Sequence, residues 1–184
     1  MNSRKPPELD RRSLIAAAFA VLEAEGLAGL SMRRVAARLG VQAPAIYWHV
    51  EDKAMLLGLM AGEIYAAAYA GVPPVADWRD WLRQFGGALR RSFTARRDGA
   101  QLCSIARPAY ADPPEQAAII AAPLETLGLD RRSALLFQAA VISFTLGWRM
   151  FEANGPMHAF LDEMMDFEDS FRTGLEAMVA GLPA

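Results

Sequence analysis

Apolar residues recur three and four positions apart along most of the chain, and this spacing predicts a protein built only from helices. No stretch shows the alternation of apolar and polar residues that is typical of a strand. The expected helices cover residues 9–25, 31–39, 44–50, 51–69, 78–97, 114–127, 130–154 and 158–179, with a short helical segment that ends at 103.

The stretch from residue 31 to residue 53 predicts two short helices joined by a tight turn. Ser31 suits the N-cap of the first helix, because its hydroxyl can accept from a free backbone N–H. Gly40 supplies the left-handed residue that ends this helix, and Pro44 fits the first turn of the second. This separation is that of a helix-turn-helix. An ordinary helical hairpin would have the same pattern, but the small residues that begin the second helix favour DNA, because a recognition helix must approach base edges closely.

The residues expected to contact DNA lie in and around this motif. Arg33 and the small residues 42–45 would face the base edges, whereas the aromatic and basic residues that follow would contact the DNA backbone. The complete set is Ser31, Met32, Arg33, Gln42, Ala43, Pro44, Ala45, Tyr47, Trp48, His49 and Lys53.

The segment AARLGVQAPAIYWHVEDKAMLL resembles the DNA-binding signature of the tetracycline-repressor (TetR) family of transcriptional regulators. The similarity continues through WRDWLRQF, RRDGAQL, ARP and FTLGW to a final helix around FRTGLEAMV. The resemblance implies an all-α chain, with a three-helix DNA-binding domain at 1–53 and a larger ligand-binding and dimerisation domain at 54–184. It also implies a ligand-responsive transcriptional regulator, a repressor that a small molecule releases from operator DNA.

The resemblance places the effector site in the second domain. The corresponding positions hold Tyr69, Phe85, Leu89, Cys103, Ala106, Arg107, Pro108, Ile120, Leu135, Gln138 and Phe151. In the tetracycline repressors the drug is held with magnesium, but Cys103 stands where a metal-binding histidine would be and Phe151 where an acid would be. We therefore expect an apolar or aromatic effector, anchored by Arg107, Gln138 or Tyr110, and no metal or other cofactor. Each aromatic residue would fit a packed core equally well.

The helix expected over 130–154 is apolar nearly all round in the segment ALLFQAAVISFTLGW. Such a helix is buried on every side, and a domain of this size does not supply enough cover. A second copy of the chain would supply it, so we expect a homodimer and a palindromic operator. The expected interface residues are Phe144, Trp148, Phe151, Phe167, Phe171 and Leu175.

Two adjacent glycines, Gly86 and Gly87, lie in the middle of the helix expected over 78–97. Each weakens a helix by roughly 1 kcal/mol relative to alanine. The pair therefore indicates either close packing of another helix or space for a ligand, and we favour packing.

The distribution of charge changes the expectation that composition alone would give. The chain has 184 residues, enough for one small and one medium domain, and a formal net charge of −2, which argues against a nucleic-acid partner. Residues 1–53, however, contain eight Lys and Arg against six Asp and Glu, and the remainder contains eleven against fifteen. The basic charge thus lies at the expected DNA-binding end.

Cysteine content and hydropathy predict a cytoplasmic protein with no membrane partner. Cys103 is the one cysteine, which excludes an internal disulfide and fits a reducing compartment. The N-terminal segment lacks the apolar region of a signal peptide. The longest charge-free run, between Arg132 and Arg149, includes polar residues and is too short to span a membrane.

No combination of residues predicts an enzyme or a metal site. His158 and Asp162 are four positions apart, a spacing that can chelate a metal, but an acid near a helix start also complements the helix dipole. Two alternatives stay open beside the regulator. One is a small-molecule sequestering protein without operator binding, and the other is a helical enzyme that uses Cys103 or His158 on an apolar substrate.

Overall fold

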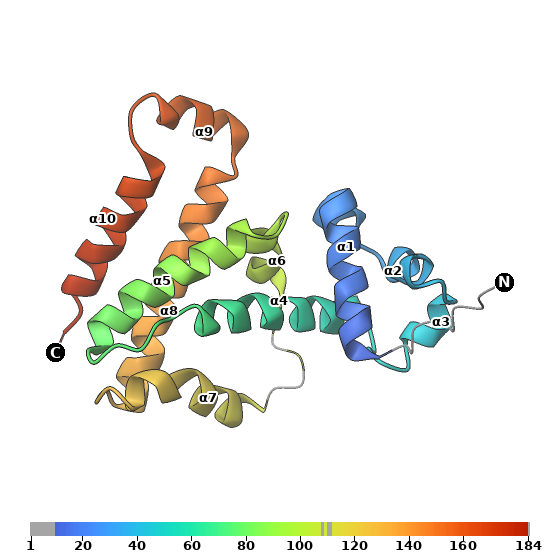
Figure 1. Cartoon of the computed structure of the whole chain (residues 1–184), viewed down its shortest axis with the longest axis horizontal. Coiled ribbons are helices and arrows are strands. Elements are labelled where there is room, and N and C mark those ends of the chain that lie inside the picture. The colour runs from blue at the N-terminus through green and yellow to red at the C-terminus, as the bar shows by residue number, and fades with distance from the viewer. Residues whose placement is uncertain (1–9, 108, 110–111, 184) are drawn as a thin grey trace. The chain divides into compact units, whose positions relative to one another are not determined.

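The computed structural model describes residues 10–107, 109 and 112–183. Within these residues the secondary structure consists of helices and turns, with no strand, which confirms the all-α prediction (Figure 1). The helices are α1 (Arg11–Gly29), α2 (Met32–Leu39), α3 (Ala43–Ile46), α4 (Lys53–Ala70), α5 (Trp78–Thr94), α6 (Gly99–Ile105), α7 (Pro113–Glu125), α8 (Arg131–Glu152), α9 (Gly155–Asp162) and α10 (Phe167–Ala180).

The chain divides into two compact units. The first contains residues 1–63 and 95–109, and the second contains residues 64–94 and 110–184. The α6 segment therefore belongs with the N-terminal helices, although the sequence alone groups it with the rest of the larger domain. The division at residue 53, drawn from the resemblance, stays a prediction.

The first unit is built around α1, which begins at Arg11, two residues after the expected start. Asp10 caps it by accepting from the backbone N–H of Ser13 at 2.7 Å. The fully buried face of α1 includes Leu14 and Leu22. Gly26, expected to end the helix, instead marks a break inside it with φ of +70°, and the helix resumes as far as Gly29.

The second unit is a bundle in which α5 packs against α8 and α10, and α7 packs against α8. A Cβ atom on Gly86 would lie 2.7 Å from the Leu175 side chain and 3.2 Å from that of Val141, so this glycine permits close helix packing. A Cβ on Gly87 would meet only Arg91, at 3.5 Å. The packing interpretation of the glycine pair is therefore confirmed for Gly86.

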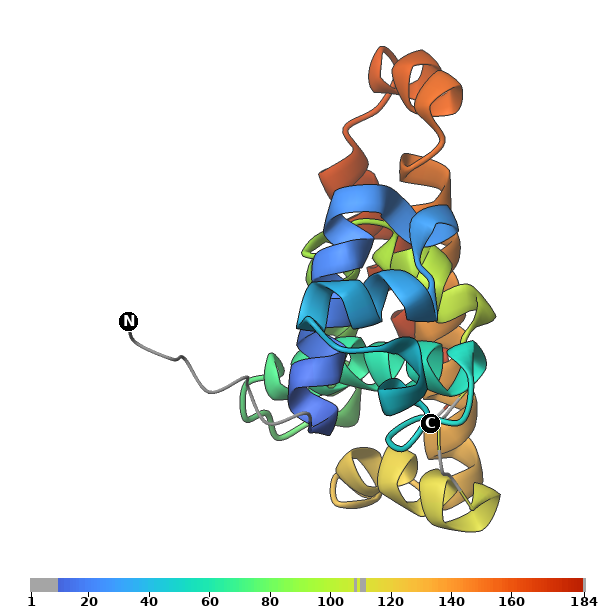
Figure 2. The same ribbon diagram turned by 90° about the vertical axis from the view of Figure 1, so that its right-hand side faces the viewer.

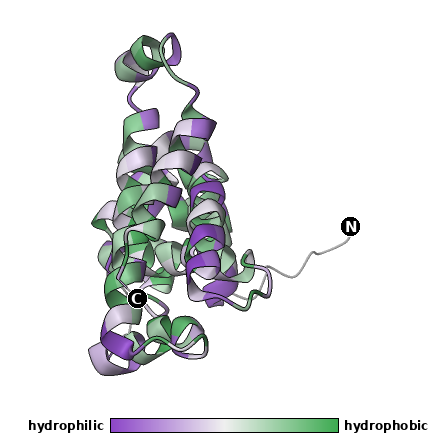
Figure 3. Ribbon diagram, turned by 90° about the vertical axis from the view of Figure 1, so that its left-hand side faces the viewer, coloured by the Kyte–Doolittle hydropathy of each residue, from purple (hydrophilic) through white to green (hydrophobic). Residues whose placement is uncertain are grey.

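The single helix expected over 158–179 is wrong, because the chain forms two helices there. Asn154 caps α9 and Asp166 caps α10, where it accepts from the N–H of Asp169 at 2.7 Å. Figure 2 shows α9 beyond the ends of α8 and α10. No residue of α9 is buried, although apolar residues, green in Figure 3, occur along it.

In the single chain, one face of α8 is exposed to solvent. Leu136 is 62% exposed and Met150 42%. By length and composition α8 also passes for a membrane span, and it is the one helix of the described residues that does. Core helices of soluble proteins pass the same test, so this finding alone does not indicate a membrane protein.

Candidate nucleic-acid interface and ligand site

The first helix of the helix-turn-helix forms as the sequence predicts. The Ser31 hydroxyl accepts from the N–H of Arg34 at 3.4 Å and caps α2. Val35 and Ala36 are buried on its inner face. Gly40 then adopts the left-handed conformation, with φ of +70°, and ends the helix.

The second helix is shorter than expected. The sequence predicts a helix that includes Tyr47 and Val50, but α3 ends at Ile46 and a turn follows. In this turn the N–H groups of His49 and Val50 both donate to the carbonyl of Ile46, at 2.9 and 3.1 Å. Ile46 and Val50 are 0% and 1% exposed, so both anchor the segment in the core.

The aromatic residues after α3 lie at the surface. Trp48 is 89% exposed and Tyr47 52%. Between the anchors Ile46 and Val50, their side chains are thus presented outward on a short, fixed turn. Indole N–H and phenol O–H groups in such a position can donate to phosphate oxygens.

The arginines of α2 differ in what they contact. Arg34 donates to the carbonyl of Gly29 at 2.6 Å and pairs with Glu25 at 2.8 Å, so it serves the internal structure of the unit. Arg33 is exposed, and no ion pair among the described residues includes it. Arg33 is therefore better placed than Arg34 to meet an external partner.

The remaining positions of the predicted DNA surface differ in exposure: Gln42 and Pro44 are exposed, and Ala43, Ala45 and His49 are partly buried. Met32 is 9% exposed and packs in the core, so its side chain does not extend this surface. Lys53 is the exposed first residue of α4, but Asp52, beside it, accepts from the N–H of Met55 at 2.7 Å and caps the helix. The cap already satisfies part of this helix terminus, so a phosphate contact at this point would have to come from the Lys53 side chain.

A clamp between the turn at 96–98 and α1 was missed by the sequence analysis. The Asp98 carboxylate accepts from the N–H of Leu27 at 2.7 Å, and Arg97 donates to the carbonyls of Glu23 and Ala24 at 3.1 and 3.0 Å. The absence of a side chain at Gly26 leaves room for this approach, since a Cβ there would lie 3.0 Å from the Asp98 carboxylate. The clamp holds the start of α6 on α1.

In the second unit, three of the predicted ligand positions form a polar chain. The Tyr69 hydroxyl donates to Gln138 Oε1 at 2.8 Å, and Gln138 Nε2 donates to the carbonyl of Ile120 at 2.6 Å. Gln138 is fully buried, and burial raises the pKa of Tyr69 to about 12. Phe85 packs against Tyr69, with ring centroids 4.9 Å apart. The site thus combines an aromatic wall with a buried amide and hydroxyl.

The other predicted ligand positions are distributed between the units. Leu89 is fully buried, Leu135 is partly buried and Phe151 is 39% exposed in the second unit. Cys103, Ala106 and Arg107 belong to the first unit, and Pro108 and Tyr110 lie outside the described residues.

The described residues offer little for nucleophilic or metal chemistry. Burial raises the pKa of Cys103 to about 12, so its thiol stays protonated at neutral pH. No group of three or more His, Cys, Asp or Glu side chains that could hold a metal occurs in the part of the chain that the structure describes. His158 instead stacks on Phe167, with ring centroids 4.6 Å apart.

The predicted interface residues form two layers. Phe167, Phe171 and Leu175 are 8%, 3% and 5% exposed, because they are already packed within the chain. They therefore lie beneath the surface, contrary to the expectation that they would dominate it. Phe144 and Trp148 are partly buried, and with the exposed Phe151 they form the outer layer on α8. Trp148 has ring contacts to both Phe144 and Phe151, at 5.8 and 6.4 Å.

Comparisons with known proteins agree with this arrangement. The family model for bacterial regulatory proteins of the tetR family matches residues 14–60. The tetracycline repressor protein class D of Escherichia coli is 35% identical over 144 residues, which are 76% of this chain and 64% of the relative. This alignment thus spans slightly less than two thirds of the length of that repressor.

Solved structures are similar over nearly the whole chain. TetR (class A) in complex with 5a,6-anhydrotetracycline and magnesium has a TM-score of 0.73 and 30% identity, over 95% of this chain and 98% of that one. A TetR variant from Acinetobacter baumannii AYE in complex with minocycline has a TM-score of 0.76 and 29% identity, over 95% and 96% of the two chains. The homologues are transcriptional regulators and not enzymes. This chain therefore belongs to the TetR family.

Proposed function

We propose that the chain is a DNA-binding transcriptional repressor that acts as a homodimer in the cytoplasm and is released from its operator by a small molecule. The helix-turn-helix, followed by a turn on which Tyr47 and Trp48 are exposed, is the observation that carries this proposal. The inner face of this motif is packed in the core, and its outer surface exposes Arg33 and Trp48. The domains of this function are residues 1–53 for DNA and 54–184 for the effector and the second copy.

The DNA surface has two kinds of contact. Arg33 and residues 42–45 read base edges, and the alanines among them recognise shape and methyl groups more than hydrogen-bonding groups. Tyr47, Trp48, His49 and Lys53 contact the sugar-phosphate backbone and set the register of the short α3. Ser31 acts through its cap on α2.

The effector site is centred on Tyr69, Phe85 and Gln138. Relatives are described in complex with minocycline, or with 5a,6-anhydrotetracycline and magnesium. Phe85 and the ring of Tyr69 favour a flat apolar or aromatic molecule, and the Tyr69–Gln138 hydrogen bond can be exchanged for bonds to such a ligand. A neutral Cys103 and an exposed Phe151 do not supply magnesium ligands, so the effector binds without metal.

A second copy covers the open face of α8. Phe144, Trp148 and Phe151 border this face at a spacing of three and four residues, and the exposed Gly147 on it has nothing near its Cβ position. Large and small residues on one face can interdigitate with the same face of another copy. A two-fold dimer of this kind places two recognition helices on a palindromic operator.

A gel-shift titration with the DNA that flanks the gene tests the central proposal. We expect a specific protein–DNA complex that competitor DNA does not remove. The identified effector should dissociate this complex. Effector binding without any DNA complex would favour a sequestering protein. Turnover of a bound apolar molecule, lost on Cys103→Ser, would favour the enzyme.

A further inference from the structure

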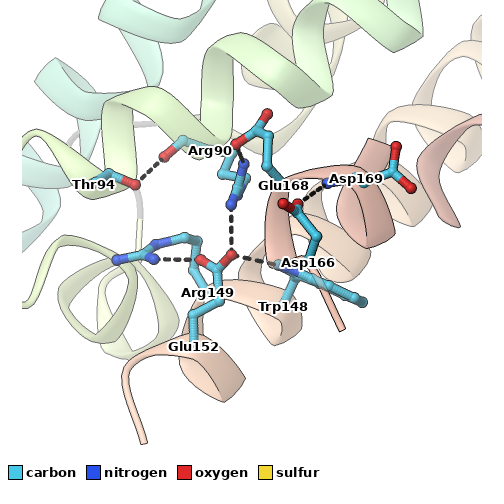
Figure 4. A network of polar contacts seen from close by, with 8 residues as sticks. All are labelled: Arg90, Thr94, Trp148, Arg149, Glu152, Asp166, Glu168 and Asp169. Carbon is cyan, nitrogen blue, oxygen red and sulfur yellow. Dashed lines mark hydrogen bonds and ion pairs between the residues drawn. The ribbon is translucent and has the colours of Figure 1, made fainter. Parts of the chain in front are cut away.

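Arg90 of α5 takes part in a closed circuit of contacts with α8 and α10. Its guanidinium donates to Glu152 at 2.6 Å and also to Glu168, and it lies 4.8 Å from the centre of the Phe171 ring. Glu152 in turn accepts from the indole N–H of Trp148 at 3.0 Å (Figure 4). Trp148 and Phe171 close the circuit through an edge-to-face contact of 6.0 Å.

The circuit joins the two ends of the segment that contains α9. Glu152 is the last residue of α8, and Glu168 is the second residue of α10. Arg90 thus holds the chain on both sides of residues 153–166, a segment whose helix has no buried residue of its own. The end of α8 and the start of α10 are therefore both bound to a side chain from α5.

Within the circuit, the charges of Arg90 and Glu152 are largely buried and paired with each other. The side chains of Arg90 and Glu152 are 16% and 5% exposed, and Arg149 also donates to Glu152. Burial opposes both charges, yet the hydrogen bonds to its two glutamates raise the pKa of Arg90, and those from the two arginines lower that of Glu152. A buried ion pair adds little net stability over apolar packing, so its main contribution here is to fix one geometry.

The circuit fixes the orientation of Trp148, which belongs to the outer layer of α8. Trp148 donates its N–H to the circuit, while its ring contacts Phe144 and Phe151. A tryptophan without this hydrogen bond could rotate about its side-chain bonds and move both neighbours. With it, the indole has one orientation at the surface where the second copy is expected.

We propose that Arg90 is the positioning residue for the homodimer surface: through Glu152 and Phe171 it holds Trp148 in the orientation that meets the second copy. This inference rests on the homodimer proposed above. In a two-fold interface the same surface occurs twice, so a misplaced Trp148 disturbs the contact on both sides.

The test compares Arg90→Lys with Arg83→Lys. Arg83 is a matched control because it also lies on α5 and binds a glutamate of α10, Glu176, at 2.5 and 2.8 Å, but has no contact with the circuit. Lysine keeps the charge and cannot reach two acceptors in the fork geometry of arginine. Two quantities are measured: the dimer dissociation constant by sedimentation, and the NMR signals of the tryptophan indole N–H groups, with that of Trp148 assigned by Trp148→Phe.

We expect Arg90→Lys to weaken the dimer by about tenfold and to shift the Trp148 indole signal. Arg83→Lys should change the dissociation constant by less than about twofold, as an exposed pair does. Equal effects of the two variants, or a weaker dimer with an unmoved Trp148 signal, would overturn the positioning role. A wild-type protein that stays monomeric at micromolar concentration would instead overturn the proposed homodimer itself.

A second pair of variants keeps the test valid if Arg90→Lys does not fold. The side chain of Glu168 is 77% exposed, so Glu168→Gln removes one contact of Arg90 without emptying the core. Its control is Glu176→Gln, which removes the exposed partner of Arg83. We expect the first variant to weaken the dimer about threefold and the second to leave it unchanged, and the same affinity for both would contradict the inference.

Discussion

The carboxylate of Asp98 accepts a hydrogen bond of 2.7 Å from the backbone N–H of Leu27, which precedes it by 71 positions in the chain. Leu27 follows the break at Gly26, so Asp98 satisfies a donor that the interrupted helix leaves free. Asp98 itself has φ of +52°, a conformation that Asp and Asn tolerate better than other residues with side chains.

Replacing Asp98 by alanine should lower the free energy of unfolding by about 1–3 kcal/mol. The substitution removes the hydrogen bond to Leu27, and alanine tolerates the left-handed backbone conformation less well than aspartate does. Asp98→Asn keeps an acceptor and the backbone preference, so it should cost less than half as much. Urea unfolding of the three proteins measures the difference. Equal stability of Asp98→Ala and wild type would show that this bond does not hold α6 on α1.

The two neighbouring glycines of α5 should respond to alanine in opposite ways. Gly86→Ala places a methyl 2.7 Å from the buried Leu175 side chain, and such overpacking costs about 1–3 kcal/mol, more than the helix preference of alanine returns. Gly87→Ala meets nothing closer than 3.5 Å and should stabilise the protein by roughly 0.5–1 kcal/mol. Thermal unfolding of both variants and the wild type measures these changes in stability. Stabilisation by both substitutions would mean that α10 can move away from α5.

Signals that act over three or four residues allowed most helices to be predicted. Ser31 begins and Gly40 ends a helix through a contact with a nearby backbone group, so their identity and position were enough. The same logic failed after α3. There, Val50 reaches the core through a turn and not through a helix. Two apolar residues four positions apart are compatible with either structure, so the spacing of Ile46 and Val50 could not distinguish them.

Contacts between distant residues could not be predicted from their local sequence. The polar chain from Tyr69 to Gln138 depends on which helices become neighbours, and the pattern around each residue does not contain this information. The resemblance had indicated both positions, but not that they bond to each other. In the same way, Glu152 lies among apolar residues near a helix end, and only the fold reveals that Arg90 neutralises it.

Stability in acid should depend on Glu152. Burial raises the pKa of this carboxyl, but the hydrogen bonds from Arg90 and Arg149 outweigh it and hold the pKa below the usual 4.5. The stabilisation is complete above the pKa of the unfolded chain, and it is lost as the pH falls through the lower pKa of the folded protein. Glu152→Gln should therefore be less stable at neutral pH and show a shallower loss of stability below pH 4.5.

The control for this dependence is Glu176→Gln. Glu176 also has a lowered pKa, through its hydrogen bonds to Arg83, but it is exposed and solvent screens its charge. Its removal should leave the acid limb of the stability curve close to that of the wild type. A Glu152→Gln curve parallel to that of the wild type would show that other carboxyls govern acid unfolding.

Effector binding should not require a divalent metal. Cys103 is a neutral buried thiol and Phe151 an apolar side chain, so neither replaces the ligands that magnesium prefers. Thermal-shift screening with apolar and aromatic compounds identifies the effector, and its affinity should be the same with and without EDTA. Tyr69→Phe removes the hydroxyl bound to Gln138 and should weaken binding of a hydrogen-bonding effector. Tight, magnesium-dependent binding of tetracycline would refute this assignment.

Two basic residues should contribute to operator binding in different ways. Lys53 lies exposed at the start of α4, where we propose a contact to phosphate, so Lys53→Ala should lower affinity evenly for all sequences and reduce the salt slope by about one unit. For Arg33 we propose a contact to base edges, so Arg33→Ala should cost roughly 1–3 kcal/mol on the operator alone and relax one position in each half-site. Arg34→Ala is the control for lost charge, because Arg34 is bound to Gly29 and Glu25 within the unit. Fluorescence anisotropy on the operator and on scrambled DNA, at several salt concentrations, separates the three variants. If Arg33→Ala and Lys53→Ala had the same effect on both DNAs, the assignment of base and phosphate contacts would be wrong.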